Sequence, residues 1–171
     1  MTLAGASEDA PSGNDTLDRY LGCMFGIAIG DTIGYPVEFR PLADIQRRYG
    51  PSGIAILPIG GLYSDDTQMS LATADGLIEA KKGGQPIQLV YREYLRWLGT
   101  QKSSSQRRAP GGTCLSALAS GRMGTVDNKL NDSKGCGGVM RTAPAGLACV
   151  PEVAFQYGVE FAAITHSHPS G

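Results

Sequence analysis

The pattern that most constrains the fold is a series of segments with helical spacing, separated by glycine-rich loops. The chain has 24 glycines among 171 residues, and several of them cluster between apolar segments. Only residues 54–59 have the composition of a strand, and Pro58 weakens that pattern because proline lacks the N–H that a sheet requires. We therefore predict an all-α protein.

The sequence predicts seven helices. Along residues 86–98 apolar side chains form one stripe at helical spacing, which is typical of an amphipathic helix. Residues 17–29 are apolar and rich in small side chains, and this composition predicts a buried helix packed closely by its neighbours. The other predicted helices lie at residues 44–49, 65–82, 113–120, 139–148 and 153–164.

Bulk composition fits one globular domain with a core of its own. The chain has 42% hydrophobic and 18% charged residues, and residues 1–14 are predicted to be a disordered leader. Its formal net charge of −1 gives no reason to expect binding to nucleic acid or to a membrane. The start of the chain lacks the basic and apolar pattern of a signal peptide. The four cysteines are scattered, without a CxxC pair, so we expect reduced thiols and a cytoplasmic location.

Two adjacent carboxylates stand at the start of the predicted helix at residues 65–82. The run Ser64-Asp65-Asp66-Thr67 places four oxygen-bearing side chains in four residues. One interpretation is a helix cap, in which Ser64 or Asp65 caps the helix and Asp65 forms a capping box with Gln68. The other is a site for a hard cation such as Mg2+ or Ca2+, because such ions prefer oxygen ligands.

Two glycine-rich segments carry further candidates. Glu38 follows a Gly/Pro turn, where its carboxylate either points into a cleft or is solvated at the surface. Gly111 and Gly112 precede a predicted helix, where they either approach an anionic ligand or form a plain N-cap with Thr113.

The densest glycine cluster lies just before the predicted helix at residues 139–148. Gly135, Gly137 and Gly138 fall within four residues and predict a backbone nest for phosphate or ribose oxygens. The segment matches neither the Walker A loop nor the dinucleotide fingerprint. Arg141 is expected to pair with a phosphate or with a structural carboxylate.

The only histidines are His166 and His168. Their spacing of two suits an extended loop, but the sequence offers no convincing third ligand for zinc. We expect a histidine here to hydrogen-bond a substrate or to cap the preceding helix.

The order of these motifs resembles the ADP-ribosylglycohydrolase family in its bacterial form, a family that includes dinitrogenase reductase-activating glycohydrolases and ADP-ribosylhydrolases. The resemblance extends from about residue 17 to residue 171. The motifs that carry it are Gly30-Asp31 with Glu38, then Ser64-Asp65-Asp66-Thr67, then Ala109-Pro110-Gly111-Gly112-Thr113-Cys114, then Gly135-Cys136-Gly137-Gly138-Val139-Met140-Arg141, and finally Thr165-His166-Ser167-His168-Pro169.

The resemblance implies a compact all-α bundle that hydrolyses the N- or O-glycosidic bond between ADP-ribose and a protein side chain or related acceptor. It also implies two Mg2+ ions, with Mn2+ as a substitute, and ADP-ribose or an ADP-ribosylated protein as the partner. The implied metal ligands are Ser64, Asp65, Asp66 and Glu38, of which Glu38, Asp65 and Asp66 are also the implied catalytic residues. The implied ADP-ribose contacts are Gly135, Cys136, Gly137, Gly138, Val139, Met140, Arg141 and His166.

One departure from the family pattern bears on these expectations. Members carry a second acidic motif, Asp-x-Asp-Thr, in their C-terminal half, and this sequence contains none. Residues 15–171 are therefore expected to be the N-terminal part of such a domain, with the other segment separate or missing. The alternative is a degenerate relative that binds ADP-ribose or has a structural role without catalysis.

Overall fold

The structure, a computed structural model, describes residues 13–170. Within this range every regular element is helical, so the all-α prediction is confirmed. Residues 1–12 of the predicted leader lie outside the described residues, whereas Gly13 and Asn14 already belong to the first helix. The elements are α1 (Gly13–Gly34), η1 (Tyr35–Val37), α2 (Leu42–Tyr49), α3 (Asp65–Ala80), α4 (Pro86–Thr100), α5 (Gly112–Ala119), η2 (Val139–Arg141), α6 (Ala143–Ala148) and α7 (Pro151–Ala163).

Every predicted helix is present, although several ends shift. The predicted helix at residues 139–148 is divided at Thr142 into the 3-10 turn η2 and helix α6. Pro144 explains the division, because a residue without an N–H fits the first turn of a helix but interrupts a longer one. Residues 54–59 form a loop and not a strand.

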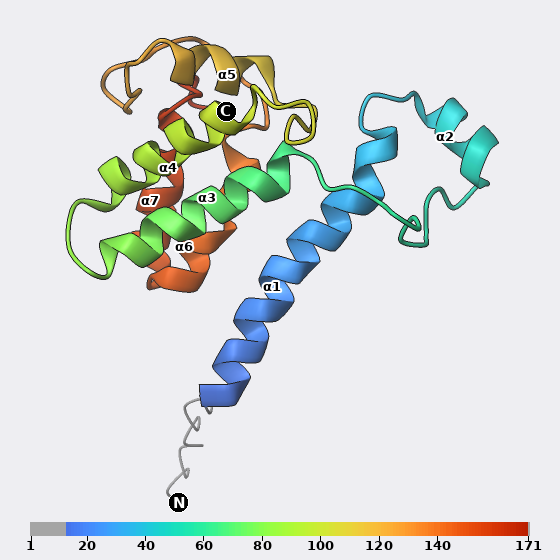
Figure 1. The fold of residues 1–171 in the computed structure, drawn as a ribbon, viewed down its shortest axis with the longest axis horizontal. Coiled ribbons are helices and arrows are strands. Elements are labelled where there is room, and N and C mark those ends of the chain that lie inside the picture. The colour runs from blue at the N-terminus through green and yellow to red at the C-terminus, as the bar shows by residue number, and fades with distance from the viewer. Residues whose placement is uncertain (1–12, 171) are drawn as a thin grey trace, which may run out of the picture.

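The core lies where α3 and α4 form a helical hairpin against α5, α6 and α7 (Figure 1). A Cβ atom on Gly76 would lie only 2.6 Å from the Cα atom of Val90, so glycine is required for this close approach of α3 to α4. The buried side chains at the centre are Met69, Val90, Tyr94, Leu118, Phe161 and Ile164.

The prediction that the first helix is buried is wrong for the described residues. Helix α1 extends away from the bundle and ends in the α2 region, as Figure 1 shows. Leu21 is 45% exposed, Phe25 is 63% exposed and Ile29 is 47% exposed. Among the bundle helices only α3 and α6 touch α1 to any extent, so its small and apolar side chains have few neighbours to pack against.

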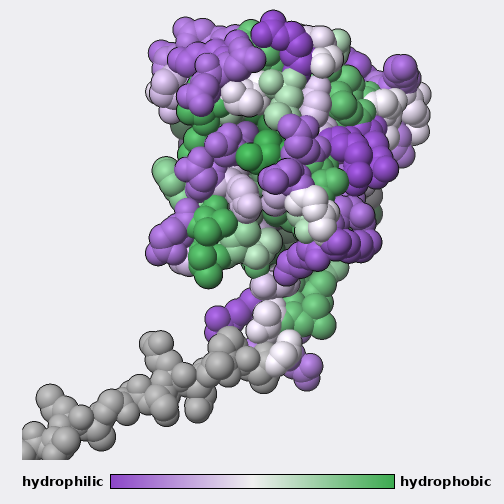
Figure 2. Space-filling model, turned by 90° about the vertical axis from the view of Figure 1, so that its left-hand side faces the viewer, coloured by the Kyte–Doolittle hydropathy of each residue, from purple (hydrophilic) through white to green (hydrophobic). Residues whose placement is uncertain are grey.

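The surface of the bundle is mixed in character. On the side that carries the turn between α3 and α4, hydrophilic and hydrophobic side chains are interspersed (Figure 2). No helix within residues 13–170 combines the length and the apolar character that a membrane span requires.

Candidate functional site

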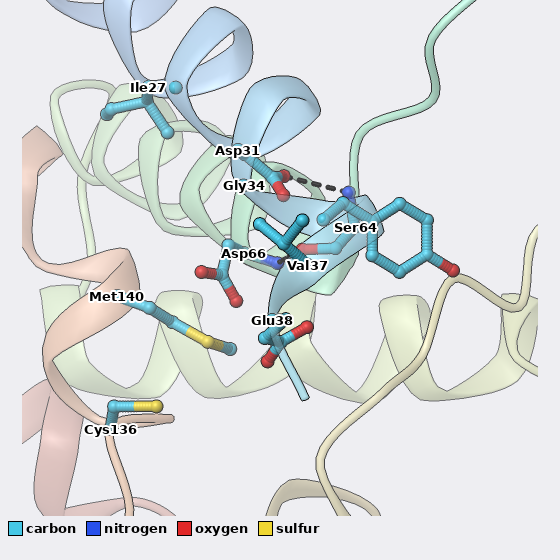
Figure 3. A pocket seen from close by; sticks show the side chains of 11 residues that line it. Ile27, Asp31, Gly34, Val37, Glu38, Ser64, Asp66, Cys136 and Met140 are labelled. Carbon is cyan, nitrogen blue, oxygen red and sulfur yellow. Dashed lines mark hydrogen bonds between the residues drawn. The ribbon is translucent and has the colours of Figure 1, made fainter. Parts of the chain in front are cut away.

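A cavity of about 510 Å3 lies where the end of α1, η1, the start of α3 and the loop before η2 meet. Three stretches that are distant in sequence contribute its walls, at residues 27–38, 64–66 and 136–140. Figure 3 shows Asp66 and Glu38 on one side of this space and Met140 and Cys136 on the other. Asp31 and Ser64 also line it.

The start of α3 is held by a carboxylate from α1. One oxygen of Asp31, Oδ2, accepts hydrogen bonds from the backbone N–H of Ser64 at 2.8 Å, from that of Thr67 at 3.1 Å and from the Thr67 hydroxyl at 2.5 Å. An anion at a helix N-terminus satisfies orphan donors and interacts favourably with the helix dipole. Asp31 therefore fixes α3 to α1 beside the cavity. The sequence motif contained Asp31 but gave it no role, since the contact joins residues more than thirty positions apart.

The cap of α3 confirms one interpretation and contradicts another. Ser64 is the N-cap, and its Oγ accepts the backbone N–H of Asp66 at 3.1 Å. The predicted capping box between Asp65 and Gln68 is wrong. The Gln68 side chain accepts a hydrogen bond from Trp97 Nε1 at 2.9 Å and donates one to the Gln106 carbonyl at 2.8 Å. Those partners draw Gln68 away from the helix start.

Asp65 is buried behind the cavity wall. Its Oδ2 accepts the backbone N–H of Gly111 at 3.1 Å, and its own N–H donates to the Arg108 carbonyl at 2.9 Å. Burial raises the pKa of Asp65 to about 6; the Gly111 hydrogen bond opposes this rise, and the charges of Asp66 and Glu38 add to it. Gly111, the glycine just before α5, thus contacts this carboxylate. The N-cap of α5 is Gly111, and the predicted cap at Thr113 is wrong.

Asp66 and Glu38 face the cavity without a cationic partner. Burial raises the pKa of Glu38, and the charges of Asp66 and Asp31 raise it further. Burial also raises the pKa of Asp66, with Asp31 adding to the rise. No Lys or Arg among the described residues forms an ion pair with either carboxylate. Carboxylates that repel one another in this way favour the binding of a cation.

The donor set fits a hard cation in type but is incomplete in number. The side chains of Ser64, Asp66 and Glu38 offer only oxygen, the ligand atom of Mg2+. Within residues 13–170, however, no three His, Cys, Asp or Glu side chains come together closely enough to hold a metal ion by themselves. The cavity therefore presents part of a coordination shell.

The glycine loop before η2 forms the wall opposite the carboxylates. Cys136 and Met140 line the cavity, whereas Val139 is 66% exposed on another side. None of Gly135, Gly137 and Gly138 has a positive φ, so the left-handed turn of a backbone nest is not formed here. Close packing explains the glycine at position 137, where a Cβ atom would lie 2.7 Å from the His166 ring and 2.9 Å from Cys114 Sγ.

Arg141 is completely buried and faces the protein interior. Its guanidinium lies 4.4 Å from the centre of the Tyr94 ring and donates to the Phe161 carbonyl at 2.9 Å and to Thr165 Oγ1 at 2.6 Å. The alternative of a structural carboxylate as its partner is wrong, because no Asp or Glu among the described residues forms an ion pair with Arg141. This placement does not fit the expected direct contact between Arg141 and ADP-ribose.

His166 lies beneath the glycine loop and outside the wall of the carboxylate cavity. It borders a separate cavity of about 250 Å3 with Lys129 and Ser167. Its Nδ1 is 2.9 Å from Thr165 Oγ1. Burial lowers the pKa of His166 to about 4, and the positive charge of Arg141 contributes to the decrease. The neighbouring His168 accepts the backbone N–H of Ser170 at 3.0 Å, which is a local turn contact.

Comparisons with known proteins agree on one family. A family model described as ADP-ribosylglycohydrolase matches residues 12–171. The chain is 32% identical over 167 residues to the ADP-ribosyl-[dinitrogen reductase] glycohydrolase of Rhodospirillum rubrum, covering 92% of this chain and 54% of that protein. It is 33% identical over 109 residues to the ADP-ribosylarginine hydrolase Tri1 of Serratia proteamaculans, covering 61% of this chain and 29% of that protein. An uncharacterized protein of Archaeoglobus fulgidus is 31% identical over 137 residues, covering 76% of this chain and 43% of that protein. The chain thus spans about half the length, or less, of these curated relatives.

Proposed function

This chain belongs to the ADP-ribosylglycohydrolase family, and on that premise we propose that it serves the Mg2+-dependent hydrolysis of a glycosidic bond to ADP-ribose. The bond joins ADP-ribose to a protein side chain or a related acceptor. The names of two relatives, which describe glycohydrolysis of ADP-ribosylated dinitrogen reductase and of ADP-ribosylarginine, support this reaction class.

One observation carries the proposal. Asp66 and Glu38 stand together, without a basic partner, on the wall of a cavity of about 510 Å3. Hydrolysis of a glycosidic bond passes through an oxocarbenium-like transition state, which carries positive charge at the sugar ring. A wall with two free carboxylates stabilises that charge electrostatically.

We assign the Mg2+ ligands to Ser64, Asp65, Asp66 and Glu38. Asp65 is included although it lies behind the wall, because Asp66 and Glu38 are close enough to raise its pKa. When bound, the ions polarise substrate oxygens and make a bound water more acidic. The small number of ligands agrees with a partial coordination shell in this chain, which covers only 54% of the length of the Rhodospirillum rubrum relative.

The chain's own residues have separable tasks in this proposal. Asp66 and Glu38 orient the attacking water and accept its proton, since their raised pKa values make them better bases than ordinary carboxylates. Asp31 fixes the helix that carries Ser64 and Asp66. Cys136 in the glycine loop and Met140 in η2 hold ADP-ribose from the opposite wall.

A second candidate, binding of ADP-ribose without catalysis, has one observation in its favour. No three metal-binding side chains converge within residues 13–170. Under this alternative the same cavity and loop bind ADP-ribose, but no bond is broken.

Release of ADP-ribose from an ADP-ribosylated protein separates the two candidates. The assay uses the chain with Mg2+, with EDTA, and as the Asp66→Asn and Glu38→Gln variants. Asp127→Asn is the matched control, since Asp127 is an exposed acid that does not line the cavity. We expect Mg2+-dependent release that falls by about a hundredfold or more in the two cavity variants. Calorimetric binding of ADP-ribose without metal-dependent release would leave only the binding role.

A further inference from the structure

Arg141 is a buried cation that lacks an anionic partner among the described residues. Its side chain is 0% exposed, and its Nε atom has no hydrogen-bond partner. An unpaired buried charge is costly, so a charge kept in such a place requires strong compensating contacts. The Tyr94 ring, the Phe161 carbonyl and the Thr165 hydroxyl supply them.

Arg141 determines the direction of the hydrogen bonds that the Thr165 hydroxyl makes. A guanidinium only donates, so Thr165 Oγ1 must accept from Arg141 Nη2 at 2.6 Å. The single hydroxyl proton then remains available for another acceptor. The imidazole nitrogen Nδ1 of His166, at 2.9 Å, is a better acceptor than the nearby thiol of Cys114.

The hydrogen bond that Thr165 donates to Nδ1 determines the tautomer of the His166 imidazole. An Nδ1 atom that accepts a hydrogen bond carries no proton of its own, so a neutral ring has its proton on Nε2. The groups around the ring oppose the charged form. They are the cation Arg141, the buried thiol Cys114, the backbone of the glycine loop, and Lys129 and His168 on the cavity that His166 borders, and none of them supplies a negative charge.

The Nε2 edge of His166 is turned toward the glycine loop. A Cβ atom on Gly135 would lie 3.4 Å from Nε2, and one on Gly137 would lie 3.1 Å from it. Nε2 makes no hydrogen bond to any described residue. The described residues contain three buried side-chain polar atoms without a partner, namely Tyr91 Oη, Gln101 Oε1 and Arg141 Nε. His166 Nε2 also lacks a partner but is not one of these buried atoms, so it retains access to solvent.

We propose that Arg141 is a positioning residue which, through Thr165, holds His166 as a neutral imidazole with its proton on Nε2. His166 then presents a hydrogen-bond donor beside Gly135 for an oxygen of the ligand, a phosphate or ribose oxygen of ADP-ribose. The ligand's identity rests on the proposed function, whereas the state of the imidazole does not. This assignment also explains why an arginine of the expected ligand loop is buried and not in the cavity.

Nitrogen NMR of the histidine rings tests the proposal in the unmodified chain. Protonated and unprotonated imidazole nitrogens have different chemical shifts, and only two histidines contribute signals. At neutral pH we expect His166 to show an unprotonated Nδ1 and a protonated Nε2. A proton on Nδ1, or a charged ring, would overturn the proposal.

Two substitutions at position 165 test whether the Thr165 hydroxyl controls the tautomer of His166. Thr165→Val keeps the side-chain shape but removes the hydroxyl, and Thr165→Ser keeps the hydroxyl. We expect Thr165→Val to lose the preference for the Nε2 proton and Thr165→Ser to retain it. The control Thr100→Val, at an exposed residue of α4 whose hydroxyl bonds only Trp97 and Gln101, leaves the His166 signals unchanged. An unaltered tautomer in a folded Thr165→Val protein would show that Arg141 and Thr165 do not control the ring.

Calorimetry with ADP-ribose separates this proposal from the proposed function. We expect Thr165→Val to weaken the affinity roughly three- to tenfold, the value of one hydrogen bond, and Thr165→Ser to restore it. Wild-type affinity in Thr165→Val would remove His166 from the ligand contacts. Absence of ADP-ribose binding in the wild type, with the Nε2 proton in place, would overturn the proposed function and leave the positioning of the imidazole intact.

Discussion

At the scale of single residues, one carboxylate oxygen organises the start of α3. Asp31 Oδ2 accepts three hydrogen bonds, two from backbone N–H groups and one from the Thr67 hydroxyl. Hydrogen bonds to a charged acceptor are stronger than neutral ones. Their partners would be left unsatisfied at a partly buried helix end if Asp31 were removed.

Removal of this acceptor is therefore expected to destabilise the fold measurably. We expect Asp31→Ala to lower the free energy of unfolding by about 1–3 kcal/mol and Asp31→Asn, which keeps one oxygen acceptor, to lower it less. Urea denaturation measures the difference. Asp127→Asn, at an exposed acid, should remain within about 0.5 kcal/mol of the wild type. Equal losses in Asp31→Ala and Asp127→Asn would contradict the role assigned to Asp31.

The titration of His166 gives a prediction with a definite sign. Its pKa is lowered from 6.5 to about 4 by burial and by Arg141, so between these values the unfolded chain binds a proton that the folded chain does not. The His166 contribution to stability is therefore present above pH 6.5 and is lost as the pH falls toward 4.

Comparison with His166→Gln isolates this contribution. Asp65, whose pKa is raised to about 6, acts in the opposite direction over nearly the same range, but it is present in both proteins and cancels in their difference. We expect the wild type to lose stability relative to His166→Gln as the pH falls from 6.5 to 4, measured by urea denaturation at each pH. A constant difference would mean that His166 titrates normally in the folded chain.

At the scale of helices, the sequence pattern is sufficient to locate each α-helix, although not the 3-10 turn η1, and it does not identify the partners against which a helix packs. Helical spacing along residues 86–98 predicted α4 because one apolar stripe faces the core. The same kind of composition in α1 predicted burial, which is wrong for the described residues, since local composition does not specify which neighbours are present. Local sequence does not reveal the partners of the Gln68 side chain or the burial of Arg141 for the same reason, because each depends on contacts twenty or more positions away.

Exposure of α1 predicts an unusual tolerance to polar substitution. Phe25 is 63% exposed, so we expect Phe25→Ser to change the free energy of unfolding by no more than about 0.5 kcal/mol. Met69 in α3 is fully buried, and Met69→Ala should cost about 2–5 kcal/mol because it creates a cavity. Urea denaturation compares the two variants. A loss of several kcal/mol in Phe25→Ser would show that the apolar side of α1 is covered in solution.

At the scale of the whole molecule, the cavity is built by bringing together three stretches of the chain, at residues 27–38, 64–66 and 136–140. Sequence motifs indicated the acidic and glycine-rich walls, and Glu38, Ser64, Asp66, Cys136 and Met140 do line one cavity. The burial of Asp65 and the separation of His166 from this cavity could not be read from motif order, because order carries no information on side-chain direction.

Addition of Mg2+ is expected to stabilise the folded chain through this cavity. At a free Mg2+ concentration about five times the dissociation constant, binding contributes about 1 kcal/mol, which raises the Tm by about 2–4 °C. EDTA should reverse the increase, and Asp66→Asn should abolish it. The measurement is a thermal melt with NaCl at matched ionic strength as the control. An equal increase in NaCl would indicate screening of the carboxylates and not binding.

The bridge from Asp31 to α3 has a thermodynamic consequence for α1. Glu38 follows α1 in the chain, whereas Asp66 belongs to α3, so the spacing of the two carboxylates depends on how firmly these helices are joined. A contact that holds α1 in place then raises the affinity of the cavity for a ligand that needs both carboxylates. The ligand raises the affinity of that contact by the same factor, because coupling between two binding events is reciprocal. Any partner that covers the apolar side of α1 would thus act as a positive effector of the cavity without touching it.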